Sequence, residues 1–279
     1  MLLADSGSTK THWWLAESGR LRASIGTRGL NPFFFTPKSM AAQLVIDLQP
    51  FIKDQQIKAV YFYGAGCSTY ANRQMVRDAL KPLLTGNPEI SVENDLLGAA
   101  RALFNKEPGI ACILGTGSNA CLYDGKEITH GLPSLGYILG DEGSGAHLGK
   151  AFLAKLLKDQ LPGELKQAFS QAYKLDRAQI LEEIYRKEHP NRFLASFSVF
   201  MHQQMHHPEI MELLGDCFEA FFREQVCKLP GYGAFAMGCV GSVGYHYRDI
   251  IRRLAIRHGI SGVAFTDSPM DGLLAYHSR

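Results

Sequence analysis

The residue types that suit nucleotide binding are concentrated in one short stretch near the first residue, Asp5–Thr11. It lies between the apolar runs 1–4 and 12–15, so it predicts two strands joined by a small-residue turn. In such a turn a glycine admits phosphate oxygens, hydroxyls and amides donate hydrogen bonds to them, and a lysine adds positive charge. The aspartate is a hard oxygen ligand suited to Mg²⁺. Taken alone, the stretch favours an ordinary hairpin turn, where the same residue types are common.

A second stretch, Gly115–Asn119, repeats this arrangement in the other half of the chain. The apolar run 110–114 leads into it and the run 120–123 follows it. Two phosphate-type hairpins in matching positions predict a duplicated fold that holds one nucleotide across a cleft. This repetition is much more specific than either turn by itself.

Asp95 is the sharpest single candidate for catalysis. It follows the short strand predicted at 90–92 and opens the helix predicted at 96–104, where the helix dipole favours an ionised carboxylate. Ligands bind at this edge of the sheet in open α/β folds, so Asp95 could accept a proton from a substrate hydroxyl. The alternative is that Asp95 only caps the helix. The two paired turns favour the base, and both roles can hold together.

Two further glycine-containing segments each open a helix. Asp141–Gly145 follows 136–140, and its carboxylates suit either recognition of sugar hydroxyls or capping. Gly241–Gly244 suits the close approach of a flat ligand such as adenine, although close packing of a helix on a strand explains it equally well.

The elements that would position these residues follow the same order in both halves. The first half reads as three antiparallel strands followed by strands that alternate with helices, which predicts a mixed sheet with helices on its faces. The second half begins this pattern at 109, departs from it in a helical stretch between 148 and 228, and resumes it at 234. The sequence therefore predicts an α/β protein whose second half carries a helical insertion.

Length, composition and charge limit the classes of partner that the chain is expected to have. The chain has 279 residues, 46% of them apolar, with a formal net charge of +2. That length suits two modest domains, and the balanced charge indicates neither a nucleic acid nor a membrane partner. Asp5 interrupts the first apolar run, which does not fit a secretory signal. The six cysteines are scattered and form no C-x-x-C pair, so we expect free thiols in a reducing cytoplasm.

Together these motifs resemble the N-acetylglucosamine kinase-like branch of the sugar kinase, actin and heat-shock ATPase superfamily, which goes with the BadF/BadG/BcrA/BcrD ATPases. The resemblance covers essentially the whole chain and is more specific for the fold and for ATP than for the substrate. It implies two ribonuclease H-like (actin-like ATPase) domains with mixed sheets. The matching segments are Asp5–Thr11, Asn94–Asp95, Gly115–Asn119, Gly140–Ser144 and Gly238–Gly244.

The resemblance also implies domain bounds. We expect an N-terminal domain at 1–106 and a C-terminal domain at 107–267, with the helical insertion at about 148–230. The C-terminal helix, 268–279, would pack back on the N-terminal domain. A homodimer is left open.

The family pattern implies a role for each matching residue. Asp5 would help to hold Mg²⁺, and Asp95 would be the base that activates the 6-hydroxyl of a sugar. The nucleotide would contact Ser6, Gly7, Ser8, Thr9, Lys10, Thr11, Gly115, Thr116, Gly117, Ser118, Gly241 and Ser242. The sugar would contact Asn31, Gly66, Asn94, Gly136 and Asp141.

The activity implied is ATP-dependent, Mg²⁺-dependent phosphorylation of an amino sugar, N-acetylglucosamine first, by a cytoplasmic kinase. Leu135–Gly136 stands where kinases for this sugar often have a tryptophan-glycine pair, which puts the identity of the sugar in question. One alternative is an ATPase that activates an iron–sulfur dehydratase or reductase, although no cysteine pair lies in a suitable loop. Another is a non-catalytic sugar- or nucleotide-binding protein.

Overall fold

The computed structural model describes residues 1–278, and these residues form two compact units. Unit 1 comprises 1–107, 124–128 and 268–278, and unit 2 comprises 108–123 and 129–267. Within the described residues there are two five-stranded sheets, each with antiparallel and parallel pairs. The predicted fold class, α/β with two mixed sheets, is confirmed.

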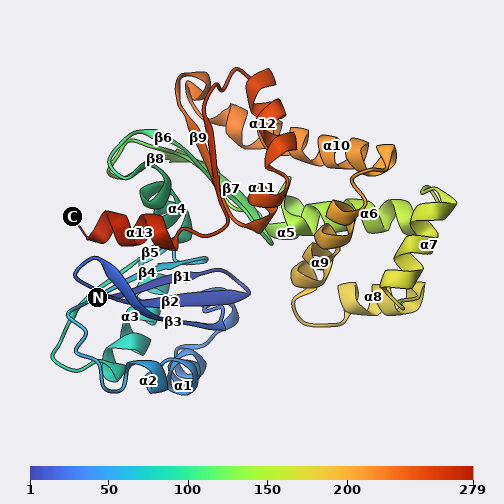
Figure 1. Cartoon of the computed structure of the whole chain (residues 1–279). Helices are drawn as coiled ribbons and strands as arrows, with labels where there is room; N and C mark the ends of the chain where they lie inside the picture. The colour runs from blue at the N-terminus through green and yellow to red at the C-terminus, as the bar shows by residue number, and fades with distance from the viewer. Residues whose placement is uncertain (279) are drawn as a thin grey trace. The chain divides into compact units, whose positions relative to one another are not determined.

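Unit 1 is a five-stranded sheet in the order β3-β2-β1-β4-β5, covered by helices on both faces. Helices α1 to α3 lie on one face and α4 and α13 on the other (Figure 1). The bounds are β1 Leu2–Ser6, β2 Lys10–Glu17, β3 Arg20–Arg28, η1 Pro32–Phe34, α1 Pro37–Asp47, α2 Gln49–Ile52, β4 Ala59–Gly64, α3 Tyr70–Leu80, η2 Lys81–Leu83, β5 Glu89–Asn94, α4 Asp95–Phe104 and α13 Met270–His277.

The alternation of side chains along β1 explains why both faces of this sheet are covered. Leu2 and Ala4 join the core under α1 to α3, whereas Leu3, one residue out of phase, packs with Met270 and Leu273 of α13. All five side chains are buried. The C-terminal helix therefore completes the core of unit 1.

Helix α1 shows how local sequence sets an element boundary. Thr36 and Ser39 form a capping box, and Pro37 occupies the first helical position. The helix ends at Asp47, and the short helix α2 that follows carries Pro50 in its first turn. Proline therefore separates the two helices.

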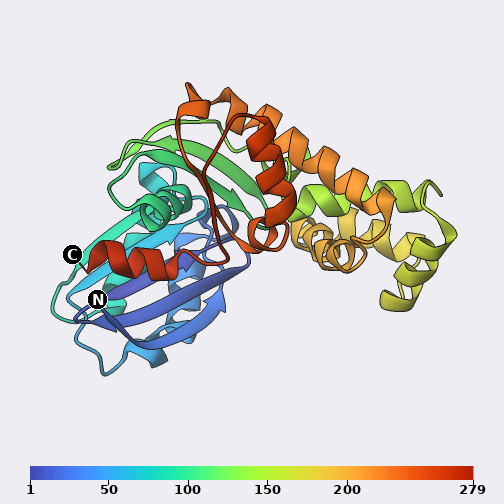
Figure 2. The same ribbon diagram turned by 45° about the horizontal axis from the view of Figure 1, so that its top comes forward.

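Unit 2 repeats the sheet in the order β10-β9-β6-β7-β8 and adds a group of helices between β8 and β9. These helices, α6 to α10, extend away from the sheet (Figure 2). The bounds are β6 Gly109–Leu114, β7 Ser118–Tyr123, β8 Ile128–Gly131, α5 Gly136–Leu139, α6 Gly145–Leu157, α7 Gly163–Ala172, α8 Arg177–Tyr185, α9 Pro190–Gln203, α10 Pro208–Glu224, η3 Val226–Lys228, η4 Tyr232–Ala234, β9 Met237–Val240, α11 Ser242–His246, α12 Arg248–Arg257 and β10 Val263–Thr266.

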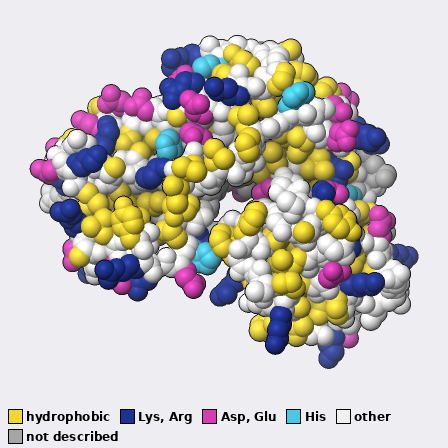
Figure 3. Space-filling view, turned by 180° about the vertical axis from the view of Figure 1, so that it is seen from behind, with side chains coloured by type: hydrophobic (Ala, Val, Ile, Leu, Met, Phe, Trp, Pro, Cys, Tyr) yellow, Lys and Arg dark blue, Asp and Glu magenta, His cyan; other side chains and the backbone are white. Residues whose placement is uncertain are grey.

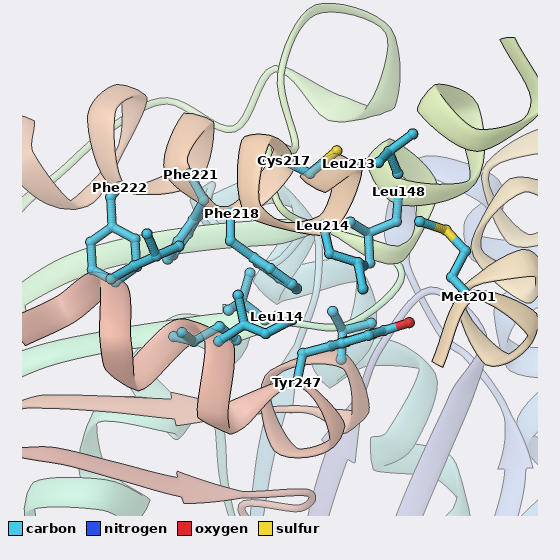
Figure 4. Packing of buried hydrophobic residues seen from close by; sticks show 14 of the residues in the cluster. Leu114, Leu148, Met201, Leu213, Leu214, Cys217, Phe218, Phe221, Phe222 and Tyr247 are labelled. Atoms are coloured by element: carbon cyan, nitrogen blue, oxygen red, sulfur yellow. The ribbon is translucent and has the colours of Figure 1, made fainter. Parts of the chain in front are cut away.

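Helix α10 joins the insertion to the sheet of unit 2. One face of it carries buried side chains at helical spacing, from Ile210 to Phe222. Phe218 points from this face toward the strand residue Leu114 and toward Tyr247 (Figure 4), and its ring centroid lies 5.5 Å from that of Tyr247. All of these side chains belong to one core cluster. The insertion and the sheet therefore share a hydrophobic core.

Three features of the structure relate to the predictions made from composition: the distribution of surface charge, the state of the cysteines and the character of the helices. On the face that Figure 3 shows, basic and acidic side chains are interspersed. Each of the six cysteines is a free thiol, and all except Cys227 are buried. Within residues 1–278, none of the helices combines the length and the apolar character that crossing a membrane would require.

A partly buried polar contact attaches α13 to the sheet of unit 1. The Tyr63 hydroxyl accepts a hydrogen bond from Arg101 at 2.9 Å and lies 2.8 Å from Nε2 of His277. The imidazole also stacks on Tyr61, with ring centroids 3.7 Å apart. Burial, and then the charge of Arg101, lower the pKa of His277 to about 4. The folded protein therefore holds this imidazole neutral.

This contact predicts acid sensitivity. The pKa of His277 lies below its unfolded value of 6.5, so the unfolded chain binds more protons between those values and stability falls as the pH falls. Between pH 7 and pH 5 we expect the wild type to lose about 2 kcal/mol more unfolding free energy than His277→Gln, which keeps an acceptor but does not titrate. Urea unfolding at the two pH values measures this, and equal losses in the two proteins would contradict it.

Candidate functional site

In unit 1, three strands end together at one edge of the sheet. The parallel register aligns Ser6 of β1 with Gly64 of β4, and Gly64 with Asn94 of β5. The N–H of Ala65 then donates to the carbonyl of Ser6 at 2.8 Å. Because Asp5 lies one residue before this row and Asp95 one residue after it, the sheet brings the two aspartates to the same edge.

The first phosphate-type turn, Gly7–Lys10, connects β1 to β2 and is closed by a hydrogen bond from the N–H of Gly7 to the carbonyl of Lys10 at 2.9 Å. Ser8 is partly exposed, and Thr9 and Lys10 are exposed. Among the described residues, the N–H of Thr9 has no protein partner. The turn therefore presents an amide, hydroxyls and an ammonium group to an incoming anion.

Ser6 and Thr11, which flank this turn, are fully buried and have protein partners. The Ser6 hydroxyl lies 2.8 Å from that of Thr11, which donates to the carbonyl of Arg28 at 3.0 Å. Ser6 also accepts from the N–H of Leu30 at 3.0 Å. These two hydroxyls therefore attach the segment after β3 to the turn.

That segment carries Asn31, the candidate sugar residue. Its side chain is buried, donates from Nδ2 to the Ser8 hydroxyl at 3.2 Å, and accepts from the N–H of Phe33 at 3.0 Å. Gly66 lies against it with φ +81°, and a Cβ at that position would collide with the Asn31 amide. The structure therefore brings Asn31 and Gly66 together beside the first turn.

Asn94, and not Asp95, is the N-cap of α4. The Asn94 side chain accepts from the N–H of Leu96 at 2.8 Å, and Asp95 is the first helical residue. The Asp95 carboxylate accepts from the same N–H at 2.9 Å. Asn94 and Asp95 therefore share the Leu96 N–H, and the Asp95 carboxylate, with two oxygens, keeps capacity to accept a further hydrogen bond.

Asp5 and Asp95 interact electrostatically, and both are surrounded by protein although each keeps some accessible surface. Burial, and then the charge of Asp95, raise the pKa of Asp5 to about 7. Burial raises the pKa of Asp95 to about 6, against the opposing effect of the Leu96 amide. Among the described residues, neither carboxylate forms an ion pair with a lysine or arginine. Two neighbouring carboxylates of this kind fit a divalent cation with oxygen preference.

The second phosphate-type turn, Gly115–Ser118, connects β6 to β7 in unit 2. The first two amides of α6 donate hydrogen bonds to carbonyls of this turn. The N–H of Gly145 donates to the carbonyl of Gly115 at 2.8 Å, and the N–H of Ala146 donates to the carbonyl of Thr116 at 3.2 Å. In the described part of the chain, the N–H groups of Thr116 and Gly117 have no protein partner. Fixed carbonyls and open amides are the arrangement that an anion requires.

Asp141 lies on this second turn. It has φ +57°, and its Oδ1 accepts from the N–H of Ser118 at 3.4 Å. A Cβ on Gly117 would lie 3.1 Å from its Oδ2. Burial, assisted by the charge of Glu142, raises the pKa of Asp141. The predicted sugar residues therefore fall into two groups, Asp141 and Gly136 in unit 2 and the others in unit 1.

The Gly241–Ser242 segment lies beside the same turn. Gly241 has φ +116°, and a Cβ there would lie 2.5 Å from the carbonyl oxygen of Leu114 and 3.4 Å from the N of Gly115. Its N–H donates to the carbonyl of Thr266 at 3.0 Å. Only glycine fits this backbone, so the start of α11 packs directly against the main chain at the end of β6.

Sequence reasoning missed one buried polar residue at this place. Gln225, at the end of α10, donates from Nε2 to the Ser118 hydroxyl at 3.0 Å and to Oε2 of Glu142 at 3.3 Å. Glu142 belongs to a motif that the sequence singles out, but Gln225 lies in a helical stretch with no motif. No sequence signal could have identified it.

Solved structures of other proteins resemble this chain over essentially its whole length. A putative N-acetylglucosamine kinase from Porphyromonas gingivalis is 44% identical, with a TM-score of 0.96, over 100% of this chain and 98% of that one. Another putative N-acetylglucosamine kinase, from Chromobacterium violaceum, is 19% identical with a TM-score of 0.71, over 99% and 98% of the two chains. A scan against protein-family models finds no match, and a search of curated proteins finds none either.

More distant structures share the fold alone. A ROK family glucokinase from Streptomyces griseus, solved in complex with glucose and AMPPNP, is 14% identical with a TM-score of 0.55, over 99% of this chain and 98% of that one. The predicted two-domain fold of sugar kinases and actin-like ATPases is therefore confirmed.

Proposed function

We propose that this chain is an ATP-dependent sugar kinase, because it belongs to the same protein family as the putative N-acetylglucosamine kinase of Porphyromonas gingivalis. In its specific form, it transfers the terminal phosphoryl group of ATP to the 6-hydroxyl of an amino sugar, N-acetylglucosamine first. Membership of the BadF/BadG/BcrA/BcrD ATPases stays a prediction, as does the cytoplasmic location.

One observation carries the proposal. Within unit 1, a single sheet edge holds the paired carboxylates Asp5 and Asp95, the phosphate-type turn and the buried amide of Asn31. Metal binding, phosphate binding and sugar binding each require one of these groups. Phosphoryl transfer depends mainly on positioning and on charge neutralisation, and this arrangement supports both.

Asp5 would hold Mg²⁺, which supplies charge neutralisation at the phosphates when bound. Its pKa of about 7 in the metal-free protein reflects burial beside Asp95, and a cation would favour the ionised carboxylate. Phosphate contacts would come from Gly7 to Lys10 and from Gly115 to Ser118. Ser6 and Thr11 would support the first turn from inside, because their hydroxyls have protein partners. Gly241 and Ser242 would lie against adenosine.

Asp95 would be the general base. With a pKa of about 6, its carboxylate is mostly ionised at neutral pH and yet more basic than an ordinary aspartate. Both properties suit the removal of a proton from a sugar hydroxyl. Asn31, Gly66, Asn94, Gly136 and Asp141 would contact the sugar.

A screen of sugars tests the proposal. With ATP and Mg²⁺, we expect phosphorylation of N-acetylglucosamine to the 6-phosphate at a higher kcat/KM than for glucosamine, N-acetylmannosamine, N-acetylmuramic acid or glucose. Mass spectrometry of the product measures this. A preference for another sugar would overturn the specific form alone. ATP hydrolysis without transfer to any sugar, or binding without turnover, would overturn the kinase and favour an activator ATPase or a sensor.

A further inference from the structure

Gln225 joins the helical insertion to the rest of unit 2. It follows α10 directly and precedes η3, and its backbone bonds fix it on both sides. Its N–H donates to the carbonyl of Phe221 at 3.0 Å, and its carbonyl accepts from the N–H of Lys228 at 3.2 Å. The residue is 8% exposed, and a polar side chain this buried requires partners.

The partners of the Gln225 side chain are Ser118, at the end of the second phosphate-type turn, and Glu142, in the loop before α6. The two N–H groups of the Gln225 amide are both used, one by the Ser118 hydroxyl and one by the Glu142 carboxylate. The Ser118 hydroxyl donates in turn to the carbonyl of Glu142 at 2.7 Å. One side chain from the insertion therefore closes a buried network around the first residue of β7.

The main chain at Gly143 also packs closely against α10. Gly143 has φ +73°, and a Cβ there would lie 2.7 Å from Cβ of Phe221. Phe221 points from α10 into the core, one helical turn before Gln225 (Figure 4). The loop that carries Asp141 and Glu142 is thus held by α10 through one apolar contact and one polar contact.

We propose that Gln225 is a positioning residue for the nucleotide phosphates, acting through Ser118 and Glu142 on the turn Gly115–Ser118. This inference rests on the proposed function, because it requires the turn to bind phosphate. A shift of the turn misplaces the open amides of Thr116 and Gly117, and catalytic geometry is sensitive to displacements of about 1 Å.

The test separates phosphate binding from adenosine binding by titration calorimetry. Gln225→Glu replaces the donor by an acceptor beside the Glu142 carboxylate, so we expect the Kd for Mg²⁺-AMPPNP to rise about tenfold. The Kd for adenosine should rise much less, because adenosine carries no phosphate that would contact the open amides of Thr116 and Gly117. Exchanging the two groups, in Glu142→Gln with Gln225→Glu, restores a donor opposite an acceptor and should recover most of the loss.

Two further variants secure the interpretation. Gln225→Met removes both donors without adding a charge and should weaken AMPPNP binding in the same direction if Gln225→Glu fails to fold. Gln203→Glu makes the same amide-to-acid change on an exposed residue of α9 and should bind like the wild type.

The outcomes distinguish the two proposals. Unchanged AMPPNP binding in folded Gln225 variants, equal losses for AMPPNP and adenosine, or no recovery in the exchanged pair would each overturn the positioning role while leaving the kinase proposal intact. A wild type that binds no AMPPNP would overturn the proposed function, and the inference with it.

Discussion

Replacing Asp95 by asparagine should abolish sugar phosphorylation, with kcat reduced by about 10³-fold or more, while nucleotide binding is largely retained. Asparagine keeps the oxygen that accepts from the Leu96 N–H and has nearly the same shape, but it cannot take up a proton. The helix cap is preserved because Asn94 provides it. Steady-state kinetics with the preferred sugar, together with AMPPNP titration, measures the two effects separately.

The same variant has a second expected effect, on Asp5. The charge of Asp95 contributes to the raised pKa of Asp5, so its removal should lower that pKa, and ¹³C-detected NMR titration of the Asp5 carboxyl can follow the change. Asp271→Asn is the matched control, because it makes the same substitution in the first turn of another helix of unit 1, at an exposed residue. More than a tenth of wild-type turnover in Asp95→Asn would show that Asp95 is not the base.

The elements of this fold could be predicted from the sequence because most of them have local signals. Short apolar runs on either side of a small-residue turn indicated β1 and β2. The register between strands was harder to predict from the sequence. The alignment of Ser6, Gly64 and Asn94 depends on hydrogen bonds between strands that are far apart in the sequence.

The residues of the candidate site could be predicted only where they belong to a recognisable sequence motif. Asp95 stood out because an aspartate follows a strand, but which residue caps the helix depends on side-chain geometry, and Asn94 proved to be the cap. Gln225 could not be found at all. Its contact with Ser118 spans 107 residues, and nothing in the helical pattern of α10 distinguishes one glutamine as buried. Long-range polar contacts of this kind require the folded structure.

Replacing Gly29 by alanine should disrupt the first phosphate-type turn and weaken ATP binding by about tenfold or more. Gly29 follows β3, and its N–H donates to the carbonyl of Thr9 at 3.1 Å. A Cβ there would collide with the main-chain oxygen of Gly7 and with main-chain atoms of Ser8, none of which can rotate away. The backbone must move, which we expect to cost about 1–3 kcal/mol of unfolding free energy as well. Urea unfolding and ATP titration measure the two effects.

Gly26→Ala is the matched control for this prediction. Gly26 lies on β3 only three residues earlier, and a Cβ at that position meets no atom within 4 Å. Because glycine weakens a strand, this variant should be as stable as the wild type or slightly more stable, with unchanged ATP binding. Equal behaviour of the two variants would mean that contact between Gly29 and the turn does not shape the nucleotide site. Loss of ATP binding in Gly29→Ala alone, in a protein that still unfolds cooperatively, would link the close approach of two backbones to nucleotide affinity.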